Sequence, residues 1–213
     1  EVVQVPERLI AEAKRFQEAM MMYTCAIREV KTKLEVLNDE LSIKNQRNPI
    51  EMIKSRVKKP ISIVEKLQRR NLPVTLESMM NNLDDVAGIR VICNYLDDIY
   101  YLRSLLTRSE SYTVLREVDY IKEPKDTGYR SLHLIVNVPI VISEGTMVLP
   151  VEIQLRTIAM DMWASLEHEL RYKSDRQFTD EDATRLRLCS DAISEIDQEM
   201  QDIYQDKQPR YQA

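Results

Sequence analysis

The sequence predicts an α+β fold in which helices flank a mixed β-sheet and long helices stand at both ends. Residues 7–48 repeat their apolar positions with a helical period, residues 89–156 contain short runs that alternate apolar and polar residues, and the acidic tail returns to helical spacing. The length of 213 residues favours one domain with appendages. We therefore divide the chain into an N-terminal helical arm (1–48), a central domain (49–175) and a C-terminal helical arm (176–213).

The N-terminal helix is predicted from apolar residues that follow one another at steps of four and three, starting after Pro6. These residues are Leu9, Ala13, Phe16, Met20, Tyr23, Ile27, Val30, Leu34, Leu37 and Leu41. The seam indicates either a helix that covers its own domain or one that also pairs with another subunit, and both interpretations stay open. Asn48-Pro49 is expected to end the helix, because a residue before proline disfavours helical geometry.

The remaining elements follow in order along the chain. A second helix is predicted over 49–70, with an irregularity at Pro60, followed by a short helical stretch after Pro73. Strands are predicted at 89–95, 112–118, 131–138 and 147–156, where apolar residues dominate or alternate. Helices are predicted at 97–107 and 157–173, and an acidic amphipathic helix carries Leu186 to Ile203.

Composition excludes several classes of protein. Gly88, Gly128 and Gly145 are the only glycines, so neither a Walker P-loop nor a dinucleotide-binding fingerprint is present. If the protein binds nucleotides, side chains must hold the phosphates. Three cysteines without a CxxC pair indicate neither a disulfide framework nor a zinc ribbon, which fits a reducing compartment. The absence of an apolar run of about 18 residues predicts a soluble, cytoplasmic protein without a membrane partner.

Charge is distributed unevenly along the chain. The net charge of −5 argues against a general nucleic-acid coat, so no stable nucleic-acid partner is expected. Residues 54–70 nevertheless concentrate basic side chains around a single acid, Glu65; the basic residues are Lys54, Arg56, Lys58, Lys59, Lys66, Arg69 and Arg70. This segment is where an anionic ligand would be attracted.

Polar residues on several strands point to a lined cleft. In residues 151–156 the alternation places Glu152, Gln154 and Arg156 on one face of a strand. His133 and Arg90 stand out among apolar neighbours in two other strands. One such strand alone would be read as a solvent-facing edge, but the recurrence favours a shared site.

Two further segments carry candidate ligand-binding groups. Asp84-Asp85, just before a buried strand, is either a Mg²⁺ site or a turn into that strand. The loop 120–133 surrounds Tyr129 with cations, which suits a base stacked on the ring and phosphates held by charge, although a solvated hairpin would look similar. The two histidines, His133 and His168, are interpreted as hydrogen-bonding groups rather than zinc ligands.

Taken together, these segments resemble the synthetase domain of the RelA/SpoT family, and particularly the small alarmone synthetases of the RelP group. The matching runs are Arg56-Val57-Lys58, Asp85 to Arg90, Pro124 to His133, Val151 to Thr157 and Met160 to His168. They occur in the family's order over roughly residues 49–175. The resemblance implies a nucleotidyltransferase-like fold, transfer of pyrophosphate from ATP to the 3′-hydroxyl of GDP or GTP, Mg²⁺ as cofactor and a homotetramer.

The resemblance also implies roles for individual residues. On the ATP side it implies two arginines that sandwich adenine and three basic residues on the phosphates: Arg56 and Arg90, then Lys58, Lys66 and Arg69. For Mg²⁺ and catalysis it implies Asp85 as a metal ligand and Glu152 as a metal ligand or as the base for the attacking hydroxyl. For GDP or GTP it implies a stacking tyrosine with nearby polar groups: Tyr129, with Lys125, His133, Gln154 and Asp161.

Two departures limit the resemblance. The charged motif before the acceptor loop has an apolar residue, Val118, so a preference between GDP and GTP is not transferable. We expect no counterpart of the histidine-aspartate hydrolase domain of the long relatives, because both histidines of this sequence lie inside the matching motifs. Alternative functions are another Mg²⁺-dependent nucleotidyltransferase, or a regulatory module that binds guanine nucleotides or RNA without turnover.

Overall fold

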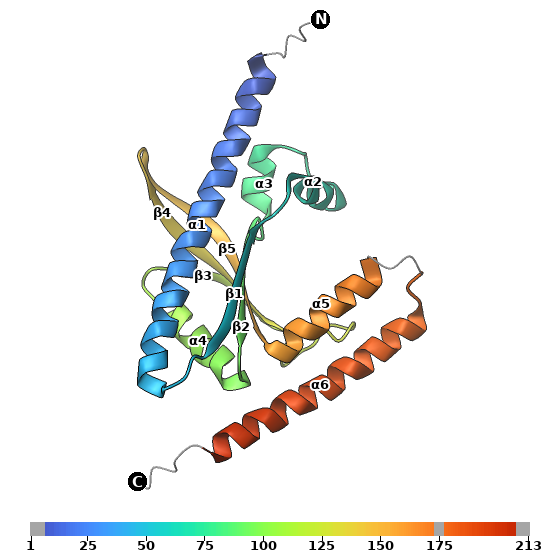
Figure 1. Ribbon diagram of the computed structural model, residues 1–213. Helices are drawn as coiled ribbons and strands as arrows, with labels where there is room; N and C mark the ends of the chain where they lie inside the picture. Colours follow the sequence, from blue (N-terminus) through green and yellow to red (C-terminus); the bar gives the residue numbers. More distant parts are fainter. Residues whose placement is uncertain (1–6, 173–176, 208–213) are drawn as a thin grey trace, which may run out of the picture.

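The computed structural model describes residues 7–172 and 177–207 and confirms the predicted α+β class. Within these residues a five-stranded sheet has the order β1-β2-β5-β4-β3, with helices on both sides (Figure 1). The strands are β1 (Ile50–Val57), β2 (Ala87–Cys93), β3 (Thr113–Asp119), β4 (Leu132–Ile142) and β5 (Gly145–Thr157). The helices are α1 (Glu7–Asn45), α2 (Pro60–Arg69), α3 (Leu76–Asn82), α4 (Leu96–Arg108), α5 (Ile158–Tyr172) and α6 (Asp180–Asp206). None of the described helices combines the length and apolar composition that a membrane crossing needs.

The register of the sheet decides which side chains share a face. β2 and β5 are parallel, whereas the other neighbouring strands are antiparallel. Arg90 pairs with Lys54 on one side and with Gln154 on the other, and Gln154 in turn pairs with His133. Because directly paired residues point to the same side of a sheet, these polar side chains project from one face.

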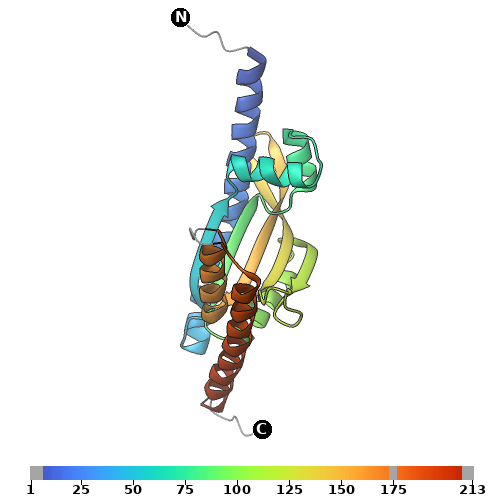
Figure 2. The same cartoon turned by 90° about the vertical axis from the view of Figure 1, so that its right-hand side faces the viewer.

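The opposite face of the sheet forms the core. α1 and α4 cover it, and α5 and α6 lie on the other side of the sheet (Figure 2). Buried side chains of β2, β4 and β5, such as Val91, Leu134 and Ile153, pack in the same cluster as Leu34 of α1 and Leu102 of α4. The apolar half of each alternating strand therefore holds the sheet to the helices, and the polar half is left for the site.

The predicted helix over 49–70 is wrong in its first half. Residues 50–57 form β1, an edge strand that pairs antiparallel with β2, and Lys58 N–H donates to the carbonyl of Val86. Long-range pairing with β2 outweighs the weak helix preference of this run. Pro60 is not an irregularity inside a helix but stands in the first turn of α2, where its missing N–H costs nothing.

The N-terminal seam divides into a buried and an exposed part. From Tyr23 to Leu41 most of its apolar residues are buried against the sheet, which confirms that the helix covers its own domain. Leu9, at the other end, is 54% exposed. Tyr23 and Val30 belong to the internal core, so charged substitutions at these two positions would test folding rather than assembly.

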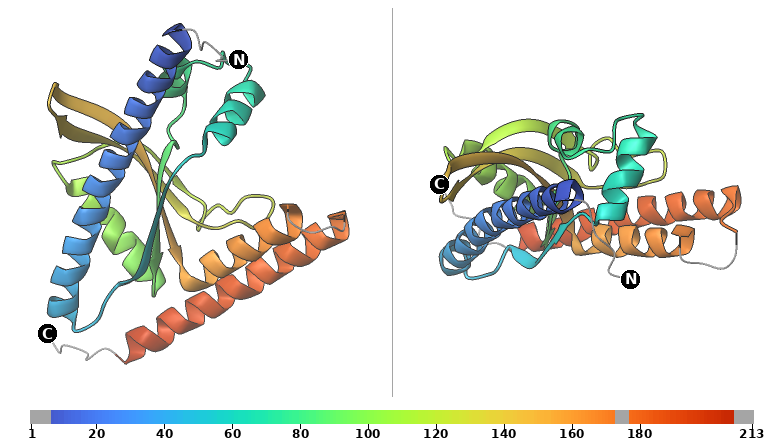
Figure 3. Two further views of the ribbon diagram at one scale, coloured as in Figure 1. Left: turned by 45° about the horizontal axis from the view of Figure 1, so that its top comes forward. Right: turned by 90° about the horizontal axis from the view of Figure 1, so that it is seen from above.

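α6 runs beside α5, and its far end lies next to α4 (Figure 3). Near its C-terminal end Tyr204 stacks on Tyr95 with ring centroids 4.3 Å apart and accepts a 2.6 Å hydrogen bond from Arg47. The guanidinium of Arg47 also holds Asp98 through two bonds of 2.9 and 2.6 Å. The helix is thereby attached to both α4 and the segment before β1.

Candidate active site

The polar face of the sheet lines a cavity of about 230 Å³. Its walls come from β1, β2, β5 and the segment that precedes β2. The lining residues are Lys54, Ser55, Arg56, Asp85, Gly88, Ile89, Arg90, Glu152 and Gln154. The structure thus brings together both carboxylates predicted for metal binding and catalysis, and both arginines predicted for adenine. The two carboxylates lie far apart in the sequence, as do the two arginines, and they meet only in the folded chain.

Asp85 is held by the two lysines that were predicted to bind phosphate. Lys58, just after β1, and Lys66, on α2, donate to the same oxygen, Oδ2, at 2.8 and 2.6 Å. Burial alone raises the pKa of Asp85, but the hydrogen bonds and charges of the lysines outweigh it and hold the pKa below its ordinary value. The carboxylate is therefore ionised. These partners favour the ligand-binding interpretation over a simple turn residue.

The second carboxylate oxygen of Asp85 is relevant to whether a metal ion fits this site. Oδ1 is buried and has no hydrogen-bond partner among the described residues, while Glu152 faces the same cavity. The part of the chain that the structure describes contains no group of three or more histidine, cysteine or acidic side chains that would cage a metal by itself. Two carboxylates with an open oxygen instead suit Mg²⁺, which takes its other ligands from phosphates and water.

Glu152 is held by an amide and an imidazole. Gln154 donates to Oε2 at 3.0 Å, and Nδ1 of His133 lies 3.3 Å from Oε1. Burial raises the pKa of Glu152, but the contacts with His133 and Gln154 lower it by more than burial raises it. The pKa therefore lies below its ordinary value. An ionised carboxylate with spare lone pairs can accept a proton from a hydroxyl group or ligate a cation.

Tyr129 is presented by a loop that α6 supports. Gly128, with a φ of +92°, makes the turn before it, and its carbonyl accepts a 2.5 Å hydrogen bond from Ser190 of α6. The phenol of Tyr129 is within 2.8 Å of Nε2 of His133, and Nζ of Lys125 lies 5.0 Å from the ring centroid. The predicted grouping of aromatic ring, lysine and histidine is therefore present in three dimensions.

Asp161 links the two sides of the candidate site. It stands in the first turn of α5, where it accepts from Lys54 at 2.9 Å, Arg90 at 3.1 Å and Arg156 at 3.3 Å. Burial raises its pKa, but Lys54 and the two arginines outweigh burial and hold the pKa below its ordinary value. Asp161 thus joins the predicted adenine arginine to the group beside Tyr129.

Arg69 is the predicted site residue that the structure leaves apart. It is exposed in the last turn of α2 and does not line the cavity. Conversely, Lys54 and Arg156 were missing from the predicted set and are found among the site residues. Both carried a signal in the sequence, because Lys54 opens the basic segment and Arg156 shares the polar side of its strand with Glu152.

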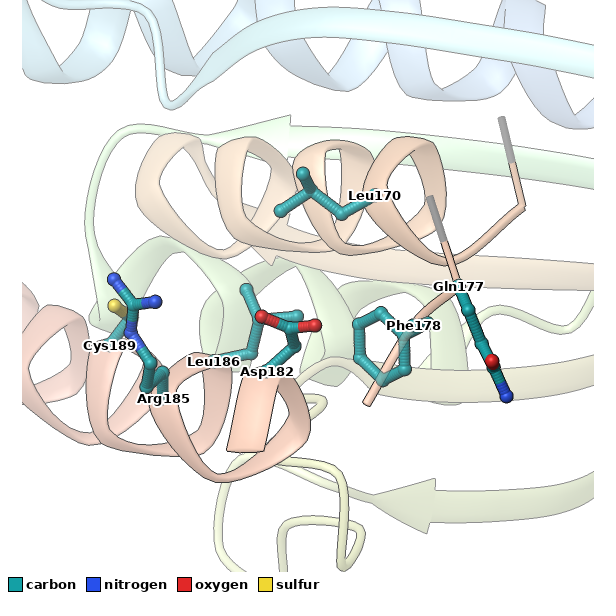
Figure 4. A pocket seen from close by; sticks show the side chains of 7 residues that line it. All are labelled: Leu170, Gln177, Phe178, Asp182, Arg185, Leu186 and Cys189. Carbon is teal, nitrogen blue, oxygen red and sulfur yellow. The ribbon is translucent and has the colours of Figure 1, made fainter. Parts of the chain in front are cut away.

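A larger hollow between α5 and α6 is not the candidate site. It measures about 380 Å³ and is lined by the side chains in Figure 4, among them Leu170, Phe178 and Cys189. It shares no lining residue with the cavity at Glu152. Its mainly apolar walls offer no paired carboxylates for chemistry on phosphates.

Comparison with known proteins gives a consistent result. The family model described as the region found in RelA/SpoT proteins matches residues 55–177. The GTP pyrophosphokinase YwaC of Bacillus subtilis is 38% identical over 189 residues, which is 87% of this chain and 88% of the relative. The crystal structure of the small alarmone synthetase 1 of Bacillus subtilis bound to its product pppGpp superimposes with a TM-score of 0.84 at 36% identity, covering 92% of this chain and 99% of that one. A second structure of that synthetase, bound to AMPCPP, has a TM-score of 0.77 at 32% identity and covers 92% and 99% of the two chains.

Asp161→Asn should remove a pH-dependent part of the stability. Because the pKa of Asp161 is lowered on folding, its contribution is present above the ordinary value of 3.8 and is lost as the pH falls through the lowered value. Urea unfolding at pH 7 should show a loss of about 2 kcal/mol in the free energy of unfolding, as for hydrogen bonds to charged groups. This difference from the unmodified protein should shrink as the pH falls below 3.8. A difference that stays constant as the pH falls would contradict the ionised pairing.

Proposed function

Since this chain belongs to the RelA/SpoT family, we infer that it is a GTP pyrophosphokinase that synthesises (p)ppGpp. It transfers pyrophosphate from ATP to the 3′-hydroxyl of GDP or GTP, giving ppGpp or pppGpp and AMP. The observation that carries this conclusion is the single cavity in which Asp85 and Glu152 face Arg56 and Arg90. Its substrates are soluble nucleotides, and the cytoplasm is the compartment we propose for it.

The ATP side of the site combines flat cations with ammonium groups. Arg56 and Arg90 are suited to stack on adenine from β1 and β2, because guanidinium planes pack on aromatic rings. Lys58 and Lys66, now on Asp85, are within reach of phosphate oxygens that enter the cavity. The assignment of Arg69 to the phosphates stays a prediction, since this side chain lies at the exposed end of α2.

Asp85 and Glu152 are the residues that would hold Mg²⁺. Bound Mg²⁺ supplies charge neutralisation on the phosphate oxygens. Exchange of Lys58 and Lys66 from the carboxylate to the phosphates would free Oδ2 of Asp85 for this role, and Oδ1 is already without a partner among the described residues. The protein itself contributes alignment and cations, which is what phosphoryl-type transfer requires.

The acceptor side positions the 3′-hydroxyl. Tyr129 supplies a ring for guanine, and Lys125 lies beside that ring to meet negative charge. His133, Gln154 and Asp161 complete this side around the ribose and the base. Glu152 accepts the proton of the 3′-hydroxyl while the hydroxyl oxygen forms a bond to the β-phosphorus of ATP. The bond between that phosphorus and the bridging oxygen breaks, and AMP leaves with this oxygen.

One assay separates this function from its alternatives. The purified protein is incubated with ATP, GDP and Mg²⁺, and the products are identified by mass. AMP together with ppGpp is the expected outcome. Release of pyrophosphate would indicate another nucleotidyltransferase, and nucleotide binding without any product would indicate a regulatory module.

Glu152→Gln should lower turnover by about a hundredfold or more, while ATP and GDP still bind. The amide keeps the shape of the side chain but neither accepts the proton nor carries the charge. Turnover and nucleotide binding are measured separately on purified protein, with Glu144→Gln at the exposed β4–β5 turn as the matched control. Turnover equal to that of the unmodified protein would remove Glu152 from the mechanism.

Asp85→Asn should raise the Mg²⁺ concentration needed for half-maximal activity by about tenfold, because one anionic oxygen is lost while the shape is kept. The neighbouring Asp84→Asn is the control, since Asp84 is more exposed and pairs with Arg116. Activity is titrated against Mg²⁺ at fixed ATP and GDP. An unchanged curve for the Asp85 variant would return this residue to a purely structural role.

We also propose that the protein assembles as a homotetramer. Large apolar side chains are exposed at the start of α1 and along α5 and α6, including Leu9, Ile10, Leu166, Leu170, Ile196 and Met200. Exposed apolar side chains of this size on several helices are typical of subunit contacts. Ile196→Asp with Met200→Asp should lower the mass in sedimentation equilibrium, and an unchanged tetramer would exclude this face.

A further inference from the structure

The side chains around Glu152 form a closed ring of hydrogen bonds. Arg156 Nη2 donates to Tyr129 Oη at 2.5 Å and to Gln154 Oε1 at 2.9 Å. Tyr129 Oη is 2.8 Å from His133 Nε2, and His133 Nδ1 is 3.3 Å from Glu152 Oε1. Gln154 Nε2 closes the ring with its 3.0 Å bond to Glu152 Oε2. Two arms therefore lead from Arg156 to Glu152, one through the amide and one through the phenol and the imidazole.

The acceptor-only carboxylate of Glu152 and the donor-only guanidinium of Arg156 set the directions of the bonds in this ring. A guanidinium is only a donor, so the oxygens of Tyr129 and Gln154 that face it must accept. Glu152 is only an acceptor when ionised, so the nitrogen of His133 that faces it, Nδ1, carries a proton; in the neutral imidazole Nε2 is then unprotonated and accepts the phenol proton of Tyr129. The proton of that imidazole lies on Nδ1, where it is donated to Glu152. Both arms thus end as donors to the carboxylate.

We propose that Arg156 is a positioning residue that orients the phenol of Tyr129 and, through it, fixes the Nδ1–H form of His133 beside Glu152. Glu152 thereby stays an acceptor, and each of its two carboxylate oxygens is held in place by one donor. The inference rests on the proposed function, because it concerns the base for the acceptor hydroxyl. It adds a second task to Tyr129, whose ring serves stacking and whose hydroxyl serves alignment.

Lysine would not replace Arg156 in this role. The arginine is 3% exposed, its Nη1 reaches Asp161, and its Cζ lies 5.0 Å from the centre of the Tyr129 ring. A planar fork meets the phenol, the amide and the carboxylate at the same time, whereas an ammonium group is a single point. The same fork also connects Tyr129 to Asp161, the partner of Arg90.

The protonated nitrogen of His133 can be observed without any nucleotide. Long-range ¹H–¹⁵N spectra distinguish the two nitrogens of a neutral imidazole, and they are recorded at about pH 8.5, well above the ordinary histidine pKa of about 6.5. The chain has two histidines, so His168→Gln assigns the signal of His133. We expect Nδ1–H in the unmodified protein, and a mixture of forms in both Arg156→Lys and Tyr129→Phe.

Steady-state kinetics test the consequence for the reaction. Tyr129→Phe keeps the ring, so KM for GDP should stay within about twofold while kcat falls about tenfold, as expected for loss of an aligning partner. Arg156→Lys should show a fall in kcat of at least that size. Tyr129→Ala should raise KM for GDP as well, because the stacking surface is lost. Arg103→Lys, which weakens a fork on Glu117 away from the cavity, is the matched control and should keep kcat within about twofold.

The outcomes that overturn the proposal are distinct from a failure of the proposed function. An Nε2–H form in the unmodified protein, or an unchanged Nδ1–H signal in Tyr129→Phe, would refute it, and so would an unchanged kcat in that variant. If Arg156→Lys does not fold, Tyr129→Phe breaks the same arm without removing a buried charge. A missing (p)ppGpp product in the unmodified protein would refute the function and leave the spectra to decide the ring.

Discussion

The parallel register between β2 and β5 is the constraint on which the site depends. It places Arg90 beside Gln154 and Gly88 beside Glu152, so that residues far apart in the sequence share one face. β4 and β1 extend the same face with His133 and Lys54. The opposite face is buried under α1 and α4, and a shift of one residue would exchange the two faces. Burial of the aliphatic half therefore secures the polar half.

The acidic residues of the site differ in their partners, and this difference matches their proposed roles. Asp85 and Asp161 are each held by cationic side chains, which ligands with negative charge can draw away. Glu152 is held instead by an amide and an imidazole. We expect a carboxylate with such partners to stay in place when phosphates enter, and the ion pairs to rearrange. This contrast matches the proposal that Glu152 accepts the proton, whereas Asp85 and Asp161 balance charge.

α6 contributes to the acceptor side although it supplies no residue to the cavity. Ser190 holds the carbonyl of Gly128, and a side chain at Gly128 would meet Ser190 at 2.9 Å, so helix and loop approach closely. Arg130 of the same loop pairs with Asp191 at 3.0 Å. The far end of the helix is anchored by Arg47 and Tyr204. The segment predicted as an arm thus sets the position of the loop that carries Tyr129.

The sequence by itself determined the fold class, most of the elements, the polar face of β5 and the set of motifs that identify the family. These properties are local, because spacing along the chain defines which side of a strand or helix a residue occupies. The prediction of a helix over residues 50–57 was wrong, because these residues become a strand only through pairing with β2. The position of Asp161 between Arg90 and Arg156, and the ring from Arg156 to Glu152, were decided by tertiary structure alone. The spacing of apolar residues along the chain assigns a residue to one face of a strand, but it does not say which strands become neighbours. Hydrogen bonds between strands exist only once the strand order and register are set.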